Sequence, residues 1–292
     1  MRPANIITAW ADILAGFAAS GAVVLPSSGM AEQSVPENLI YLAWLLLATT
    51  GLYGGGVVFN DVFDSELDAT ERPERPIPSG RASRGSAALL GSLLLFIGVI
   101  AAAQVSLLSA TLAVSIAFAA LIYDAYGKHH PVFGPINMGI CRGGNLLLGI
   151  SAVPAMLGHW FLALIPIVYI AAITTISRGE VHGSKNSTGF FALLLIMTVI
   201  CGLLALGVLK DYKIITALPF VALFAWLVLL PFIKAVREPS PLQIRTAVKA
   251  GILSLIVLDA TVAAGFASLP YGLLVLSLLP ISMAMAKIFA VT

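Results

Sequence analysis

Charged residues are scarce in this sequence. Asp, Glu, Lys and Arg together make up 10% of the 292 residues, whereas hydrophobic residues make up 59%, and the mean hydropathy is +1.00. A water-soluble fold of this composition would leave large apolar patches exposed to solvent. The scarcity of charge therefore excludes an ordinary soluble domain and predicts a protein embedded in a lipid bilayer.

Cysteine is also scarce, since the chain contains only Cys141 and Cys201. Both lie in apolar stretches, which excludes a disulfide framework and a cysteine-based metal site and indicates two buried thiols. No long linker or low-complexity tract interrupts the chain. We therefore expect one transmembrane domain over residues 1–292 and no nucleic-acid partner.

What the chain has instead is a series of apolar runs, each long enough to cross a hydrocarbon core of about 30 Å. They predict an all-α fold, a polytopic membrane bundle of nine or ten transmembrane helices. The lower number applies if two runs that are parted by only a few residues join into one helix. The runs cover residues 6–26, 38–60, 86–104, 106–123, 134–154, 158–176, 190–208, 214–233, 246–266 and 270–290.

The basic residues between the runs predict the orientation of the bundle. In a ten-span arrangement, thirteen Lys and Arg residues fall on one side, only Lys210 and Lys213 fall on the other, and Arg142 lies within a span. Loops rich in Lys and Arg face the cytoplasm. We therefore expect a multi-pass protein, in a bacterial plasma membrane, whose loops near residues 60–84, 124–133 and 177–189 are cytoplasmic.

Six of the fourteen acidic residues lie in the first of these loops, within NDVFDSELDATERPERPIPSGRASR at residues 60–84. If this stretch begins as a helix, Asp61, Asp64 and Asp68 share one face and Glu66 points away from them. Three clustered carboxylates repel one another unless a cation sits among them, and such oxygen ligands suit Mg²⁺ bridged to a phosphate. The competing interpretation is a solvated loop whose charges form weak surface ion pairs.

The pattern NDxxDxxxD followed by RPxRPIPSGR resembles the first aspartate-rich motif of the UbiA superfamily of intramembrane prenyltransferases. The opening RPxN, a YxxxxK segment after the fourth run and an acidic loop after the sixth also fall where that family has motifs. The resemblance implies that Mg²⁺ and diphosphate are held by Asn60, Asp61, Asp64 and Asp68. It further implies phosphate contacts from Arg72, Arg75 and Lys128, and a role for Tyr123 beside a developing allylic cation. Lys128 is also consistent with a simple cytoplasmic anchor.

The second acidic motif departs from the family pattern. Where the family has two acids, the sequence GEVHGS has Glu180 and Ser184, so that one carboxylate is replaced by a hydroxyl. Loss of one carboxylate is expected to weaken or remove the second metal. Either Glu180 remains a metal ligand, or Lys185 substitutes for the metal by neutralising phosphate directly. His182 is a candidate ligand for a softer metal, or a base. A loop of mixed charge that has no catalytic role explains the same residues. The segment ISRGEVHGS resembles the EboC-type branch of the superfamily.

Two polar residues inside the fifth run are candidates for substrate binding. Arg142 and Asn145 lie three residues apart on one helical face, where they would line the acceptor or phosphate end of a central cavity. Alternatively, Arg142 forms a structural pair with Asp12 or a carbonyl. Asp259 lies in a span with few other polar groups and is interpreted as structural.

These residues predict a Mg²⁺-dependent prenyltransferase that moves an isoprenyl group from a prenyl diphosphate to a lipophilic or aromatic acceptor within the membrane lipid. The expected catalytic residues are Asp61, Asp64, Asp68, Tyr123 and Lys128. The expected metal ligands are Asp61, Asp64, Asp68 and Glu180. The expected substrate-binding residues are Asn60, Arg72, Arg75, Arg142, Asn145 and Lys185. The alternative is a UbiA-like protein that binds or moves a lipophilic precursor without turnover, the altered second motif marking lost catalysis.

Overall fold

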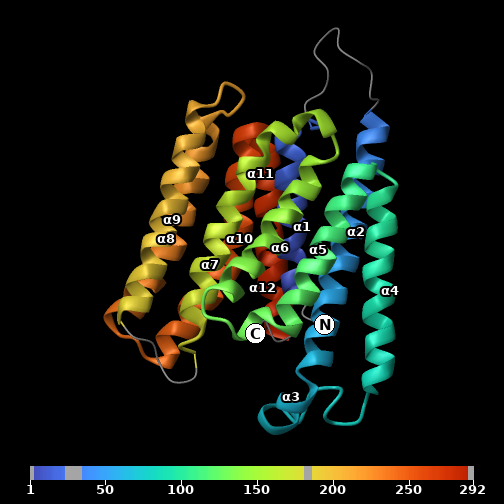
Figure 1. Cartoon of the computed structure of the whole chain (residues 1–292). Helices are drawn as coiled ribbons and strands as arrows, with labels where there is room; N and C mark the ends of the chain where they lie inside the picture. The colour runs from blue at the N-terminus through green and yellow to red at the C-terminus, as the bar shows by residue number, and fades with distance from the viewer. Residues whose placement is uncertain (1–2, 24–34, 181–185, 289–292) are drawn as a thin grey trace.

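A computed structural model describes residues 3–23, 35–180 and 186–288, and every regular element in these ranges is a helix (Figure 1). The elements are α1 (Pro3–Ala19), α2 (Val35–Phe63), α3 (Ser65–Glu71), α4 (Arg84–Ala103), α5 (Leu107–Ala125), η1 (Gly127–His129), α6 (Phe133–Ile150), η2 (Pro154–Ala163), α7 (Leu164–Ser177), α8 (Asn186–Ala205), η3 (Leu206–Val208), α9 (Ile214–Arg237), α10 (Pro241–Phe266), α11 (Leu269–Leu276) and α12 (Leu278–Ile288).

The number of membrane-crossing helices agrees roughly with the prediction of nine or ten. Among the described residues, eight helical segments are long and apolar enough to cross a bilayer. The shorter apolar helix α1 and the more polar helix α6 are packed among them. The chain is thus a multi-pass integral membrane protein, because so many apolar helices need lipid around them.

Two serines settle the boundaries that the hydropathy pattern left open. Ser106 separates α4 from α5, and Ser268 separates α10 from α11, each with extended backbone at φ −165° and ψ 163°. Their side chains accept hydrogen bonds from the backbone N–H groups of Ser109 and Tyr271, which caps the helix that follows. Both pairs of apolar runs therefore remain separate helices.

The centre of the bundle is formed by α1, α6 and α10. In α10, 78% of the apolar window is buried inside the protein, compared with 28% in α4 and in α9, which lie towards the outside (Figure 1). Polar residues of α1, α6 and α10, among them Asp12, Arg142 and Asp259, are therefore shielded from lipid. This shielding is what lets a membrane protein keep ionisable groups at depth.

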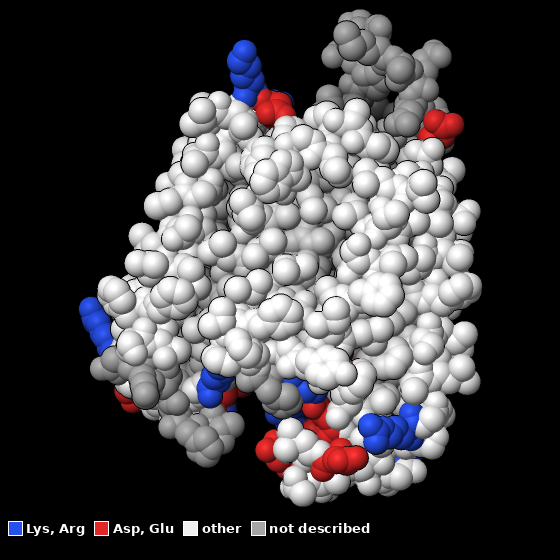
Figure 2. All heavy atoms as spheres, viewed as in Figure 1, with Lys and Arg blue, Asp and Glu red and all other residues white. Residues whose placement is uncertain are grey.

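The three loops that carry the sequence motifs meet at one end of the bundle, the lower end in Figure 1. Lys128 contacts Asp64, Arg178 donates to the backbone oxygen of His130, and Arg245 Nε donates to the Glu180 backbone oxygen at 3.1 Å. On the face drawn in Figure 2, charged side chains gather at this end, with a few at the opposite end. We call it the motif end.

Labelling of single cysteines tests this arrangement in a membrane. With Cys141 and Cys201 replaced by Ala, cysteines at Ser79 and Ser187 should react with an impermeant reagent from the same side. A cysteine at Val208, whose side chain is 87% exposed in η3, should react only from the other side. Labelling of Ser79 and Ser187 from opposite sides would contradict the fold.

The two native cysteines must be replaced because Cys201 is exposed and Cys141 is half-buried. The expectation of two buried thiols is therefore wrong for Cys201.

Candidate active site

The aspartate-rich motif lies where α2 passes into α3. Asp64 sits at the join, with φ −85° and ψ 0°, but the helical hydrogen-bond pattern continues through it. The Asp64 N–H donates to the Asn60 oxygen at 3.0 Å, and the Asp68 N–H donates to the Asp64 oxygen at 2.8 Å. Asp61 and Asp68 therefore share one face as the sequence predicted, whereas Asp64, expected on the same face, pairs with Lys128 instead.

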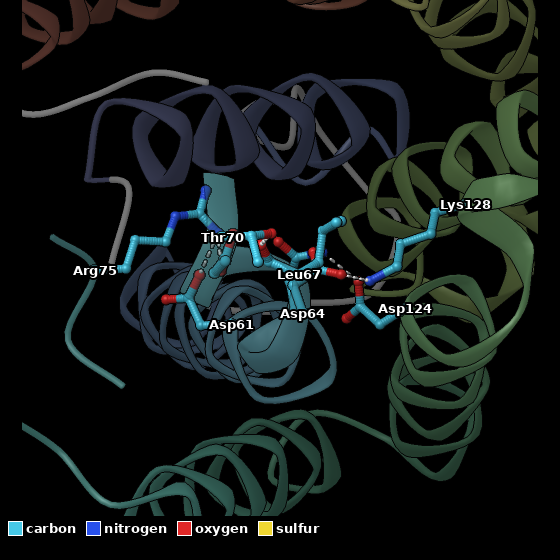
Figure 3. A network of polar contacts seen from close by, with 9 residues as sticks. Asp61, Asp64, Leu67, Thr70, Arg75, Asp124 and Lys128 are labelled. Carbon is cyan, nitrogen blue, oxygen red and sulfur yellow. Dashed lines mark hydrogen bonds and ion pairs between the residues drawn. The ribbon is translucent and has the colours of Figure 1, made fainter. Parts of the chain in front are cut away.

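Asp61 and Asp68 share one basic partner. Arg75 Nη1 lies 3.3 Å from Asp61 Oδ1 and 2.6 Å from Asp68 Oδ2 (Figure 3). The side chains of Arg75 and Asp68 are largely buried, so water screens this contact less than a surface ion pair. The loop after α3 thus folds back and places a guanidinium directly on the carboxylate face.

Asp64 points instead towards the α5–α6 connection, where it pairs with Lys128 (Figure 3). Asp124, near the end of α5, accepts a hydrogen bond from Asn60 Nδ2 at 3.0 Å. Asp124 is buried and belongs to the same cluster, although the sequence analysis did not select it. Its signal was an acid directly after Tyr123 at the end of an otherwise apolar helix.

The charges of this cluster fit a divalent cation. Asp61, Asp64, Asp68 and Asp124 supply hard oxygen ligands, and the two basic partners offset only half of their charge. Within the described ranges, no three acidic, His or Cys side chains yet converge on one point. In this arrangement the acids are therefore paired with basic side chains and do not form a three-carboxylate metal site.

Glu66 lies outside the cluster, as expected for the opposite helix face. Its side chain is 90% exposed, and its carboxylate lies 3.6 Å from Arg84. This arrangement is an ordinary surface ion pair.

The second motif approaches the first. Glu180 is half-buried just after α7, and burial raises the pKa of its carboxyl group, while the nearby Arg245 and Arg72 partly oppose this rise. Arg72 itself is exposed after the end of α3, so it remains available to a ligand at the mouth of the site. Ser184, His182 and Lys185 lie outside the described residues, and their assignments stay predictions.

Arg142 and Asn145 lie deep in the bundle, where the expected pairing of Arg142 with Asp12 is confirmed and their role in substrate binding stays a prediction. Arg142 Nη1 contacts Asp12 Oδ2 at 2.7 Å, and Asn145 Nδ2 donates to the same oxygen at 2.9 Å. Asn145 Oδ1 accepts from Thr49 Oγ1 at 2.7 Å. Arg142 is therefore the partner of Asp12, and it also lines a cavity together with Asn145.

This cavity, of about 180 Å³, runs between α1, α2, α5 and α6. Asn60, Tyr123 and Asp124 line it at the motif end, Arg142 and Asn145 line it at the deep end, and most of the wall between them is apolar. The arrangement can hold an ionic group at the mouth and keep water from a reactive centre behind it.

Comparisons with known proteins agree with this fold. The chain is 37% identical over 194 residues to the digeranylgeranylglyceryl phosphate synthase of Methanothrix thermoacetophila, covering 66% of each protein. A UbiA homologue from Aeropyrum pernix K1 in its apo form matches with a TM-score of 0.67, 16% identity and 89% and 97% coverage. A UbiA homologue from Archaeoglobus fulgidus bound to DMAPP and Mg²⁺ matches with a TM-score of 0.50, 15% identity and 99% and 100% coverage.

The similarity to an EboC-type branch is not supported, because the relatives found are digeranylgeranylglyceryl phosphate synthases. The match spans 66% of that relative's own length. The model of the UbiA prenyltransferase family matches residues 18–241, which include the aspartate-rich motif, Lys128 and Glu180. The chain belongs to the UbiA prenyltransferase family.

Proposed function

We propose that this protein is a Mg²⁺-dependent intramembrane prenyltransferase. The observation that carries the proposal is the cluster of four acids, with Arg75 and Lys128 as basic partners, at the mouth of an apolar-walled cavity. Such a cluster offers carboxylates to a cation and basic groups to a diphosphate, while the cavity behind it offers apolar walls to an isoprenyl chain. The DMAPP and Mg²⁺ bound by the Archaeoglobus fulgidus homologue support the same pairing of ligands.

The acidic residues of the site are assigned to Mg²⁺ and the basic residues to the diphosphate. Asp61, Asp64 and Asp68, with Glu180 at the second motif, would hold Mg²⁺, which supplies positive charge to the leaving diphosphate. Arg75 and Lys128 turn to the phosphate oxygens, and Arg72 approaches from the surface. Asn60, beside Asp124, borders the phosphate side of the cavity.

The bond changes follow from this placement. The C–O bond between the isoprenyl carbon and the diphosphate breaks, and pyrophosphate leaves with the electron pair. The ring of Tyr123 lines the cavity where it stabilises the resulting allylic cation. An acceptor atom bonds to that carbon and loses its proton to water or pyrophosphate. The apolar wall excludes water that would otherwise capture the cation.

The acceptor class is lipophilic or aromatic. The name of the Methanothrix relative, a digeranylgeranylglyceryl phosphate synthase, indicates a prenylated glyceryl phosphate as one product to test. The motif end faces the cytoplasm in this proposal, because most basic residues lie there. The Methanothrix relative is archaeal, so a bacterial plasma membrane stays a prediction.

A turnover assay tests the proposal. Purified protein in nanodiscs is incubated with Mg²⁺, prenyl diphosphates of increasing length, and aromatic or glycerol-based acceptors. We expect pyrophosphate release that needs both an acceptor and Mg²⁺ and stops when EDTA is added. Binding of the diphosphate without release, under all these conditions, would instead support the alternative of a protein that binds or moves a prenylated precursor. The hydroxyl at Ser184 is the observation that favours this alternative.

Ser184→Asp tests the altered motif. If Glu180 is a metal ligand, a second carboxylate four residues later should raise Mg²⁺ affinity severalfold or more. The gain in binding free energy should exceed that of one hydrogen bond, about 1 kcal/mol. A Mg²⁺ titration of donor binding measures the change. If Lys185 has replaced the metal, the new carboxylate should weaken donor binding, and Lys185→Ala should do the same. No response to either substitution would remove this loop from the site.

A further inference from the structure

The basic residue at the deep end of the cavity is already balanced. Arg142 pairs with Asp12, whose side chain is 0% exposed, and Asp259 on α10 is fully buried beside both of them. One guanidinium therefore faces two carboxyl groups, so this group of three has no excess of basic groups. Among the described residues lining the cavity, Arg142 is the only Lys or Arg. The deep end thus offers no net positive charge.

The same end nevertheless offers hydrogen bonds. The described contacts of Arg142, to Asp12 and Thr8, use two of its five N–H groups. Thr49 Oγ1 donates to Asn145 and keeps the capacity to accept. A hydroxyl or amide group can pair with these atoms without bringing charge into the bundle.

A charged or a purely apolar group suits this end poorly. A carboxylate or phosphate would lose its hydration and meet a guanidinium already neutralised by Asp12. An apolar chain end would offer no hydrogen-bond acceptor to Arg142, whose guanidinium lies over the Tyr53 ring at 5.5 Å from its centre. The ligand group that suits the deep end best is therefore polar and uncharged.

The mouth of the cavity differs from the deep end. Arg75 and Lys128 lie in the motif cluster near Asn60, whereas Thr49 lies eleven residues earlier on α2, a rise of about 16 Å. An anionic group is therefore accommodated at the mouth, and a neutral polar group at the far end. These two ends select the orientation of a substrate as well as its charge.

We propose that the acceptor binds with an uncharged hydroxyl- or amide-bearing group against Thr49, Arg142 and Asn145, and that this end rejects carboxylates and phosphates. The proposal rests on the prenyltransferase function and specifies its acceptor. The relative's name, a glyceryl phosphate synthase, does not require a phosphate at this depth.

Matched acceptor pairs test the charge preference of the wild-type protein. One pair is 4-hydroxybenzyl alcohol and 4-hydroxybenzoate, and the other is geranylglycerol and geranylglyceryl phosphate. Binding is measured in nanodiscs with Mg²⁺ and a prenyl thiolodiphosphate present. We expect the neutral member of at least one pair to bind about tenfold or more tightly than its anionic partner. Equal or tighter binding of the anionic members, or binding of none of the four, would overturn the proposal.

Charge-matched variants identify the residues responsible. Asp12→Asn/Asp259→Asn removes both acids and leaves Arg142 unbalanced, so the anionic members should gain about tenfold relative to the neutral ones. Adding Arg142→Gln makes the end uncharged again and should restore the preference for neutral acceptors. An unchanged ratio in the double variant would contradict the assignment. If these variants do not fold, as thermal unfolding would reveal, the wild-type comparison still decides.

Donor binding separates this inference from the function on which it rests. The thiolodiphosphate binds at the mouth, about 16 Å from the deep end, and its Mg²⁺-dependent affinity is measured in the same samples. Loss of that affinity in the wild type counts against the prenyltransferase itself. Intact donor binding without a preference for neutral acceptors counts only against the uncharged acceptor group.

Discussion

Asp64→Ala is expected to abolish Mg²⁺-dependent binding of a prenyl diphosphate while leaving the protein folded. Asp64 is the acid that joins the α2–α3 motif to Lys128 on the α5–α6 connection. Its loss removes one ligand of a divalent cation and leaves the half-buried Lys128 without that partner. We expect affinity to fall by at least about a hundredfold, or roughly 3 kcal/mol. Titration with a thiolodiphosphate, with and without Mg²⁺, measures this loss.

Folding should survive because the Asp64 side chain makes no capping hydrogen bond to α3, although the residue stands at the helix start. Glu66→Ala is the matched control, since it removes an exposed acid of the same motif whose nearest basic group is Arg84. It should bind Mg²⁺ and the diphosphate as the wild type does. Equal losses of affinity in both variants would mean that the cluster acts only through its total negative charge. The cation would then have no specific carboxylate ligands on one helix face.

The sequence predicted those features that depend on neighbouring residues. Helix periodicity placed Asp61 and Asp68 on one face, and both now contact Arg75. Lengths of apolar runs likewise located the helices, because the bilayer sets the length of each one. Whether neighbouring runs joined stayed open in the sequence, although the capping by Ser106 and Ser268 that separates them is also local chemistry.

Contacts between distant segments could not be predicted in the same way. Asn60 and Asp124 are 64 residues apart in the chain, and they meet only because α2 packs beside α5. The sequence motif also gave no sign that Arg75 and Lys128 would pair with these acids. Arg142 and Asp12, 130 residues apart, were considered as a pair only because a buried arginine needs one.

The crossing of α1 and α6 depends on backbone contact that no sequence pattern revealed. A Cβ atom on Gly16 would lie 2.1 Å from the Leu146 backbone oxygen, and one on Gly149 would lie 2.5 Å from the Ile13 backbone oxygen. Both obstacles are backbone atoms, so only separation of the helices relieves the clash. This crossing holds Asp12, one turn before Gly16, against Arg142.

Gly16→Ala should therefore destabilise the folded protein by about 3 kcal/mol or more, beyond the usual cost of one added methyl group in a core. Gly202→Ala on α8 is the control, because its Cβ would meet nothing within 4 Å. Alanine is the better helix former by about 1 kcal/mol, so this variant should be as stable as the wild type or slightly more so. Thermal unfolding in detergent compares the three proteins. If Gly16→Ala unfolds at the wild-type temperature, α1 and α6 are not in backbone contact, and the pairing of Asp12 with Arg142 at the deep end of the cavity loses its structural support.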